Sequence, residues 1–171
     1  MALEVNQHVV RLRRYQPFHP ESSDLIYEMT DPDEATYTMK AEAFLNSCIA
    51  DPSVSLIVLT GDAGHGKTSL SAAALRNLGM EGTEAMEAVA NYGDAAAPVS
   101  QTPDGRSVWL FSDLSSVEDQ ATEVLQRMLH LADGGVAIVC ANEGRLRAAV
   151  ARDTTGQLAT ITQTLEDGIQ T

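Results

Sequence analysis

The sequence predicts an α/β protein, a three-layer fold in which a parallel sheet carries helices on both faces. Two observations predict it. Short apolar runs typical of buried strands alternate with segments of helical periodicity, and a glycine-rich segment joins the first of these runs to the next helix. Strands that alternate with helices form parallel sheets with right-handed crossovers. The ligand site of such a sheet lies at the carboxyl ends of its strands.

The length of the chain fits one domain. At 171 residues it can bury roughly 70% of its unfolded surface. Residues 1–30 hold short mixed segments broken by Pro17 and Pro20, and we interpret them as an N-terminal extension. Asp31-Pro32 is typical of an N-cap followed by a first-turn proline, which predicts a helix from there through Ala50.

The most specific motif follows the first predicted strand, Ser55–Thr60. The segment Gly61–Thr68 fits the phosphate-binding pattern G-x-x-x-x-G-K-[ST] at every fixed position, and Ser69 continues into a helix that ends near Gly79. Strand, glycine-rich turn and helix therefore come in the order that the motif requires. The expected nucleotide-binding residues are Gly61, Asp62, Ala63, Gly64, His65, Gly66, Lys67, Thr68 and Ser69.

The chemistry of phosphate binding explains this spacing. Successive backbone N–H groups that lead into a helix N-terminus supply converging donors together with the positive end of the helix dipole. Glycines permit the close approach of the backbone and positive φ angles. Lys67 can reach the β- and γ-phosphates, and the Thr68 hydroxyl can bind Mg²⁺.

A second strand that ends in an acid is predicted further along the chain. After a short helix at Gly82–Ala90, the turn signal Asp104-Gly105 precedes the buried strand Arg106–Asp113. The spacing of apolar residues then predicts a helix over Val117–Leu131, closed by Asp133-Gly134-Gly135.

A third buried strand, Val136–Cys140, is followed by Asn142 and by a helix over Glu143–Arg152. Lys67, Asp113 and Asn142 each come soon after a strand end. Because parallel strands end at the same edge of a sheet, we expect these three side chains to converge there.

Together these three segments resemble the Walker A, Walker B and sensor-1 elements of the AAA+ branch of P-loop ATPases. The resemblance covers roughly residues 52–152, and it implies that residues 31–171 form a P-loop nucleotide-binding domain with ATP and Mg²⁺ as cofactors. It implies that Thr68 and Asp113 hold the metal and that Asn142 contacts the γ-phosphate or the attacking water. Lys67, Asn142 and Glu143 are the catalytic candidates.

For Asp113 and Asn142, simpler structural interpretations stay open. Asp113 in Ser112-Asp113-Leu114-Ser115 fits an acid that caps the next helix. Asn142 before Gly144 fits a turn-forming asparagine.

The sequence departs from the AAA+ pattern at the residue after Asp113. These ATPases place a glutamate there to polarise water, whereas this chain has Leu114. The substitutes are Glu143, beside the sensor, and Glu118, in the helix that follows Asp113. An arginine finger could come from Arg145, Arg147 or Arg152, although arginines on an exposed helix face are more often only solvated.

A narrower resemblance rests on three short stretches. Asp104–Arg106, Ser112–Ser115 and Ile138–Arg147 are similar to the ATPase component of bacterial phosphorothioation-dependent DNA restriction systems (DptF-like proteins) and related defence ATPases. This implies protein partners in a DNA-restriction or phage-defence complex and allows a homo-oligomer. Those proteins are longer, so we expect this chain to be an N-terminal part that lacks the C-terminal lid.

Charge and composition limit the partners. The net charge of −13 argues against direct nucleic-acid contact by the domain as a whole, and Arg11-Leu12-Arg13-Arg14 is its only local concentration of positive charge. Cys48 and Cys140 sit in apolar patterns and are expected to be reduced core residues. With no signal peptide and no run of ~20 apolar residues, we expect a cytoplasmic protein without a membrane span.

Two other functions share the phosphate loop. A small-molecule kinase could use the arginines of the Gly144–Arg152 helix to clamp a transferred phosphoryl group. A regulatory switch that binds nucleotide without turnover would need no catalytic glutamate.

Overall fold

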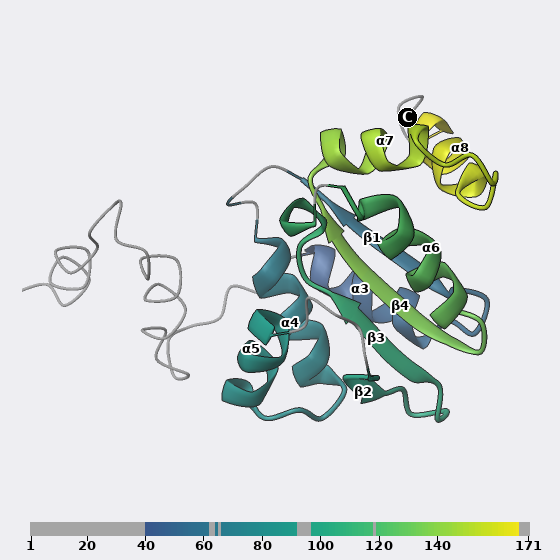
Figure 1. The fold of residues 1–171 in the computed structure, drawn as a ribbon. Coiled ribbons are helices and arrows are strands. Elements are labelled where there is room, and N and C mark those ends of the chain that lie inside the picture. The colour runs from purple at the N-terminus through teal and green to yellow at the C-terminus, as the bar shows by residue number, and fades with distance from the viewer. Residues whose placement is uncertain (1–39, 62–63, 65, 92–96, 118, 168–171) are drawn as a thin grey trace, which may run out of the picture. The chain divides into compact units, whose positions relative to one another are not determined.

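The computed structural model describes residues 40–61, 64, 66–91, 97–117 and 119–167, which belong to one compact unit (Figure 1). The first described element is the helix α3 (Lys40–Ala50). It matches the C-terminal part of the helix predicted through Ala50. The predicted start of that helix at Asp31 and the N-terminal extension, residues 1–30, lie outside the described residues.

The described strands form one sheet in the order β1-β4-β3-β2. β1 (Leu56–Thr60) pairs in parallel with β4 (Gly135–Ala141), which pairs in parallel with β3 (Ser107–Phe111). The predicted strands are therefore present, and the α/β class is confirmed. Within the described residues, β2 (Ser100–Gln101) departs from the predicted parallel sheet, because it pairs antiparallel with β3.

A tight turn explains the antiparallel strand. Only a few residues separate β2 from β3, and Thr102 N donates to Arg106 O at 2.9 Å across them. Gly105, with φ +86°, occupies a backbone conformation that side chains disfavour. A parallel connection needs a crossover of about a dozen residues, so a link this short can only join antiparallel strands.

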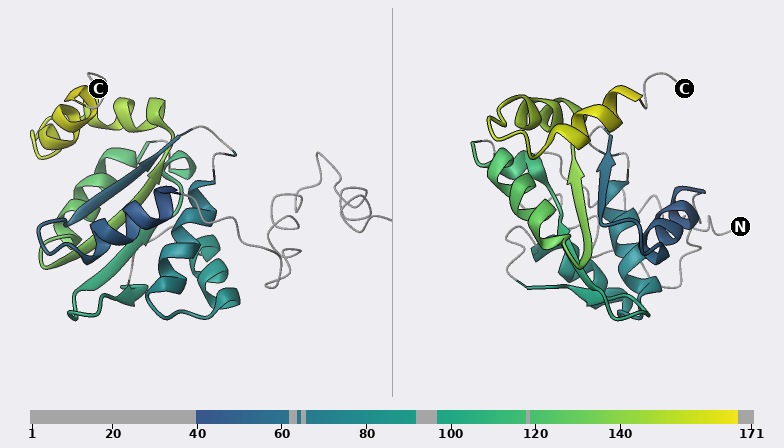
Figure 2. Two further views of the ribbon diagram at one scale, coloured as in Figure 1. Left: turned by 180° about the vertical axis from the view of Figure 1, so that it is seen from behind. Right: turned by 90° about the vertical axis from the view of Figure 1, so that its right-hand side faces the viewer.

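Helices cover both faces of the sheet (Figures 1 and 2). One core contains α3, α4 (Lys67–Asn77) and α5 (Gly82–Asn91), packed against alternate residues of the strands. The strand residues of this core are Val108, Leu110, Val136 and Ile138.

The opposite core contains α6 (Ala121–Leu131), α7 (Glu143–Ala151) and α8 (Ala159–Asp167). Its strand residues are Phe111, Ala137, Val139 and Ala141, which alternate with those of the first core. This alternation is what strands buried on both faces require.

One helix boundary and one additional helix differ from the prediction. The helix predicted over Val117–Leu131 begins at Ala121, because a separate 3₁₀ turn, η1 (Leu114–Ser116), directly follows Asp113. The helix α8 has no counterpart among the predicted elements.

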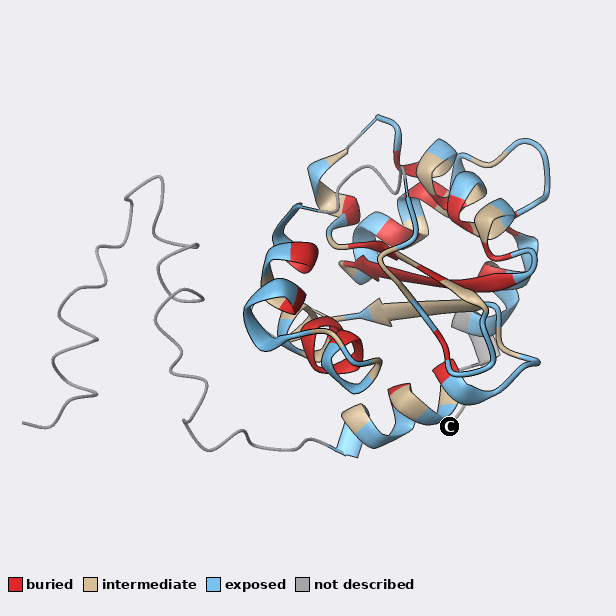
Figure 3. Ribbon diagram, turned by 90° about the horizontal axis from the view of Figure 1, so that it is seen from below, coloured by how far each residue is buried: buried red, intermediate tan, exposed pale blue. Residues whose placement is uncertain are grey.

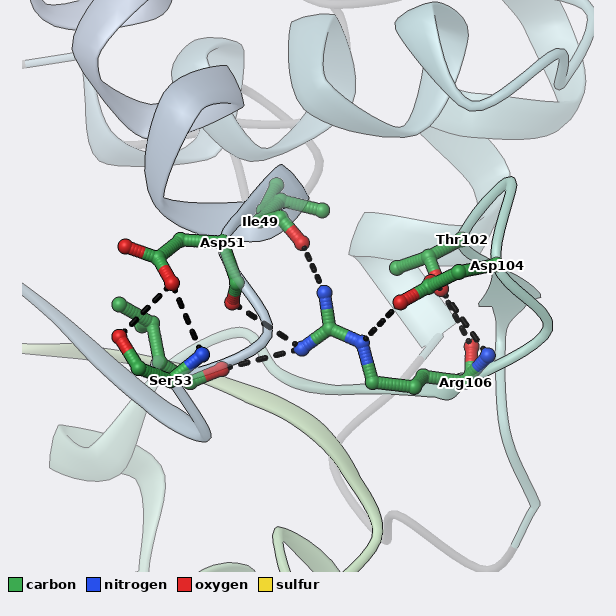
Figure 4. A network of polar contacts seen from close by, with 7 residues as sticks. Ile49, Asp51, Ser53, Thr102, Asp104 and Arg106 are labelled. Atoms are coloured by element: carbon green, nitrogen blue, oxygen red, sulfur yellow. Dashed lines mark hydrogen bonds and ion pairs between the residues drawn. The ribbon is translucent and has the colours of Figure 1, made fainter.

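Arg106 ties the β2–β3 turn to the end of α3 (Figure 4). Its guanidinium donates to the carbonyl oxygens of Ile49 at 2.8 Å and of Asp51 and Val54 at 3.2 Å each. It also forms an ion pair with Asp104 at 3.0 Å. A hydrogen bond from Thr102, with Arg106 beside it, holds the pKa of Asp104 below its usual value. The positive charge lies at a helix C-terminus, where the dipole favours it.

Burial differs sharply between neighbouring strands (Figure 3). All seven residues of β4 are buried, whereas the four apolar residues of β1, Leu56–Leu59, are only half-buried. Among the described residues β1 pairs with β4 alone, so it forms one edge of the sheet. A search of the same residues finds no helix with the length and apolar character of a membrane span.

Candidate functional site

The predicted phosphate loop joins the end of β1 to the start of α4. Gly61 directly follows β1, and Lys67, Thr68 and Ser69 form the first turn of α4. Gly64 and Gly66 have φ values of +83° and +77°, which glycine adopts without the strain that other residues incur. Three of the predicted nucleotide-binding residues, Asp62, Ala63 and His65, lie outside the described residues.

The N-terminus of α4 differs from those of the other two elements at this end of the sheet. Its N-cap is Gly66, which has no side chain with which to bond the first-turn N–H groups, and the first turn holds no acidic residue. In contrast, Asp113 caps η1 and Asn142 caps α7 through their side chains. An N-terminus left without a side-chain cap keeps its donors and its positive dipole end for an anion.

The Lys67 side chain reaches back from α4 to the end of β1. Its Nζ donates to the backbone oxygen of Gly61 at 2.6 Å. The side chain therefore joins the first turn of α4 to the end of β1 and places a positive charge at that strand end.

The parallel register brings the three strand ends together, as predicted. Thr60 of β1 lies opposite Ala141 of β4, and Phe111 of β3 lies opposite Val139. Gly61, Asp113 and Asn142 therefore follow neighbouring strands at one edge of the sheet.

The thiol of Cys140 lies near these strand ends. Burial raises its pKa, a hydrogen bond with Ser71 and the charge of Lys67 act in the opposite direction, and the charge of Asp113 adds to the rise. The charged groups of Lys67 and Asp113 thus both act on one atom near the end of β4. Cys140 is buried and reduced, as the sequence predicts, and the second free thiol, Cys48, is half-buried.

Asp113 acts as a cap and still has capacity to bind a metal. Its Oδ1 accepts a hydrogen bond from Ser115 N at 2.8 Å, which matches the capping interpretation. Asp113 is exposed, and no described residue donates a hydrogen bond to its Oδ2. One carboxylate oxygen, a hydroxyl such as that of Thr68 and phosphate oxygens are the ligand types that Mg²⁺ takes at nucleotide sites.

Asn142 also caps a helix, and the cap fixes the orientation of its amide. Oδ1 accepts from Gly144 N at 2.9 Å, so the oxygen and nitrogen of the side chain are distinguished by the hydrogen bond. Nδ2 is then the donor end, and it has no hydrogen-bond partner among the described residues. A donor is the group that a γ-phosphate oxygen requires.

Of the two proposed substitutes for the missing glutamate, the structure describes only Glu143. Glu143, the first residue of α7, pairs with Arg147 at 2.8 Å on an exposed helix face. Glu118 lies outside the described residues. Leu114, which occupies the usual glutamate position, is fully buried in the core that contains α6, and its side chain has no group that could act as a base.

The sequence patterns do not predict one buried polar pair between α4 and β4. Ser71 Oγ and Cys140 Sγ lie 3.2 Å apart, and both residues are buried. The sequence gives a weak signal for it, since Ser71 comes one helical turn after Lys67 and interrupts a run of alanine and leucine.

A cavity of about 310 Å³ lies at the opposite end of the sheet. Ser107, Trp109, His130 and Asp133 contribute to its lining, and Ser107 and Gly135 are the first residues of β3 and β4. It is separate from the strand ends that carry the loop. The described residues contain no cluster of three or more His, Cys, Asp or Glu side chains able to hold a metal by themselves.

Comparisons with protein-family models, with curated proteins and with solved structures find no match to this chain.

Proposed function

We propose that this chain is a P-loop nucleotide-binding module of the AAA+ type that binds Mg-ATP at the carboxyl ends of β1, β4 and β3. The observation that carries the proposal is the start of α4, soon after β1, where Gly66 leaves the helix without a side-chain cap and Lys67 Nζ donates to Gly61 O at 2.6 Å. A loop with positive φ angles, an uncapped helix N-terminus and a lysine supply the donors and the charge that a triphosphate needs.

The topology supports the same position. From β1 the chain enters α4, in one core, and from β3 it proceeds to α6, in the opposite core, before it returns to β4 between them. A reversal of this kind opens a crevice outside the carboxyl ends of the strands, where ligands of α/β sheets bind. Asn142 follows the central strand and so lies between Gly61 and Asp113 along that edge.

Each side chain then has a definite role. Lys67 would neutralise charge on the β- and γ-phosphates, while Thr68 and Asp113 would bind Mg²⁺. The Nδ2 group of Asn142 would donate to the γ-phosphate or to the attacking water.

Hydrolysis would depend on Glu143. An exposed ion pair contributes at most about 1 kcal/mol, so Glu143 can leave Arg147 at little cost. As a general base it would take a proton from water that attacks the γ-phosphate. We further propose, from the resemblance to defence ATPases, that partner proteins of a bacterial DNA-restriction or phage-defence complex respond to this nucleotide state.

A switch that binds nucleotide without turnover is the second candidate. Two observations favour it: Leu114 is buried where a catalytic glutamate is expected, and Glu143 is engaged by Arg147.

The test is a thermal shift with Mg-ATP. A ligand that binds only the native state adds RT ln(1 + [L]/Kd), about 2.7 kcal/mol at a hundredfold excess over Kd. We expect Mg-ATP to raise the Tm of the wild type and to leave that of Lys67→Ala unchanged.

Lys40→Ala is the matched control, because Lys40 is the other lysine of the chain and is exposed on α3. Its Tm should rise as that of the wild type does. Equal shifts for wild type and Lys67→Ala would refute the assignment.

A further inference from the structure

The pair Ser71–Cys140 links the two elements that carry the candidate site. Ser71 is 0% exposed and lies one helical turn after Lys67 on α4, and Cys140 is 1% exposed and lies two residues before Asn142 on β4. Their Oγ and Sγ atoms are 3.2 Å apart. This hydrogen bond therefore joins a side chain of α4 to a side chain of β4.

This polar contact lies in an otherwise apolar layer. Along β4 the side chains of Val136 and Ile138 face the core that contains α4, and alternation puts Cys140 on the same side. Ala72, Ala74 and Leu75 of α4 are buried in that core. Packing alone would be served by alanine or valine at both positions, because a buried hydroxyl adds a cost unless it is hydrogen-bonded.

We propose that Ser71 and Cys140 are positioning residues. Their hydrogen bond fixes the end of β4 that leads to Asn142 relative to the first turn of α4, which carries Lys67. The inference rests on the proposed function, since it concerns how phosphates held by the loop are presented to Asn142. The pair itself touches neither phosphate nor metal. Its loss should therefore change turnover more than nucleotide affinity.

The charges around the thiol support this placement. Lys67 and Asp113 both act electrostatically on Cys140, so the sulfur lies within the field of the proposed phosphate and metal ligands. Since burial raises its pKa, Cys140 stays a neutral thiol at pH 7 and keeps its S–H group. A change in the positions of Lys67 or Asp113 should alter the S–H vibration.

The first experiment compares single-turnover ATP hydrolysis with Mg-ATP affinity. Ser71→Ala and Cys140→Ala should each slow turnover about fivefold, the size expected for one lost hydrogen bond, and leave Kd nearly unchanged. The double variant Ser71→Cys/Cys140→Ser exchanges the two groups and should restore the rate.

Val139→Ala is the matched control, because it removes a buried side chain from the same strand on the opposite face. It should destabilise the protein without slowing turnover. Equal loss of rate in Val139→Ala and Cys140→Ala, or no loss in Cys140→Ala and Ser71→Ala, would overturn the inference.

A second measurement does not depend on turnover. In a Cys48→Ala background Cys140 is the only thiol, and its S–H infrared band can be followed directly. We expect Ser71→Ala to move the band without ligand, and Mg-ATP to move it in the Cys48→Ala protein.

If Mg-ATP raised the Tm but did not shift the S–H band of Cys140, the inference would be overturned and the proposed function would stay intact. Absence of any Tm shift in the wild type would instead refute the proposed function.

Discussion

Asp113 and Asn142 each combine two roles in one side chain. One oxygen of each accepts a backbone N–H and fixes the start of η1 or α7, at 2.8 Å and 2.9 Å. The remaining polar atom, Oδ2 of Asp113 or Nδ2 of Asn142, is then held in a defined direction by that bond. The capping and the ligand-binding interpretations of these residues are therefore compatible, because the cap orients the group that would act on the ligand.

The two roles of Asp113 can be separated by substitution. Asp113→Asn keeps an oxygen that can accept from Ser115 N but removes the charge, whereas Asp113→Ala removes both. We expect both variants to lose Mg²⁺-dependent nucleotide binding and to keep most metal-free binding. Only Asp113→Ala should lose the cap, at about 1 kcal/mol of stability.

Calorimetric titration of ATP with and without Mg²⁺, together with denaturant unfolding, measures these effects. If Asp113→Asn bound Mg-ATP as tightly as the wild type, Asp113 would be a cap and nothing more.

Asp153 gives a pH-dependent prediction. Its carboxylate accepts hydrogen bonds from Thr155 N and Oγ1, from Leu158 N and from Gln126 Nε2, and these bonds lower its pKa to about 2. Because the folded-state pKa lies below the unfolded value of 3.8, the stabilisation is complete above about pH 5 and is lost as the pH falls through 3.8 toward 2.

The measurement is the difference in Tm between the wild type and Asp153→Asn. It should be constant from pH 7 to about pH 5 and shrink toward zero near pH 2. A difference that did not change over this range would show that the charge of Asp153 contributes nothing.

Residue patterns could predict that Gly61, Asp113 and Asn142 follow neighbouring strand ends, because short apolar runs and the residues after them can be identified along the chain, while the roles of these residues at a nucleotide stay predictions. They could not predict the contact between Ser71 and Cys140. That contact depends on which strand lies under α4, and the order β1-β4-β3 is set by tertiary packing of segments far apart in the sequence.

At the scale of elements, the side chain of Arg106 caps the C-terminus of α3. Its guanidinium collects carbonyl oxygens from the end of the helix and the turn after it, and its side chain is only 16% exposed. Lysine cannot reproduce that planar fork. We expect Arg106→Lys to destabilise the protein by about 2–3 kcal/mol, within the range for hydrogen bonds to charged groups.

The control for Arg106 is Arg76→Lys on α4, which is exposed and should change stability by less than about 0.5 kcal/mol. Denaturant unfolding of both variants is the measurement. Similar values for the two substitutions would show that the carbonyl contacts of Arg106 are replaced by water.

Apolar periodicity located the central elements well but not their ends. It predicts a helix start at Val117, whereas α6 begins at Ala121, because the capping acid Asp113 starts a separate turn, η1, that ends at Ser116. Periodicity also gave no signal for β2, whose two residues are too few to show alternation. The resemblance implies no helix between residue 152 and the end of the chain, so the sequence does not predict α8.

At the scale of the whole molecule, we expect this chain to bind ATP and to hydrolyse it slowly. Leu114 supplies no base, and Glu143 is paired with Arg147. An arginine supplied in trans can contribute roughly 10³- to 10⁵-fold in rate. Single-turnover rates well below 1 s⁻¹, the low end of ordinary enzymes, are expected for the chain alone.

Addition of a cognate partner should raise that rate, and Glu143→Gln should then suppress turnover while binding persists. Arg147→Gln is the informative companion variant, since it releases Glu143 without altering it and should not lower the rate. Turnover near 1 s⁻¹ by the chain alone would contradict the expectation that its site is incomplete.

The position of β1 at the sheet edge has a mechanical consequence. Its outer N–H and C=O groups have no ladder partner among the described residues, and its apolar run carries neither a charge nor a proline that would discourage pairing. A strand added there would lie directly beside the segment that leads into Gly61. Under the proposed function, a strand added at this edge would therefore stiffen β1 at the point where it leads into the nucleotide site, and strand addition would be coupled to nucleotide binding through one backbone ladder.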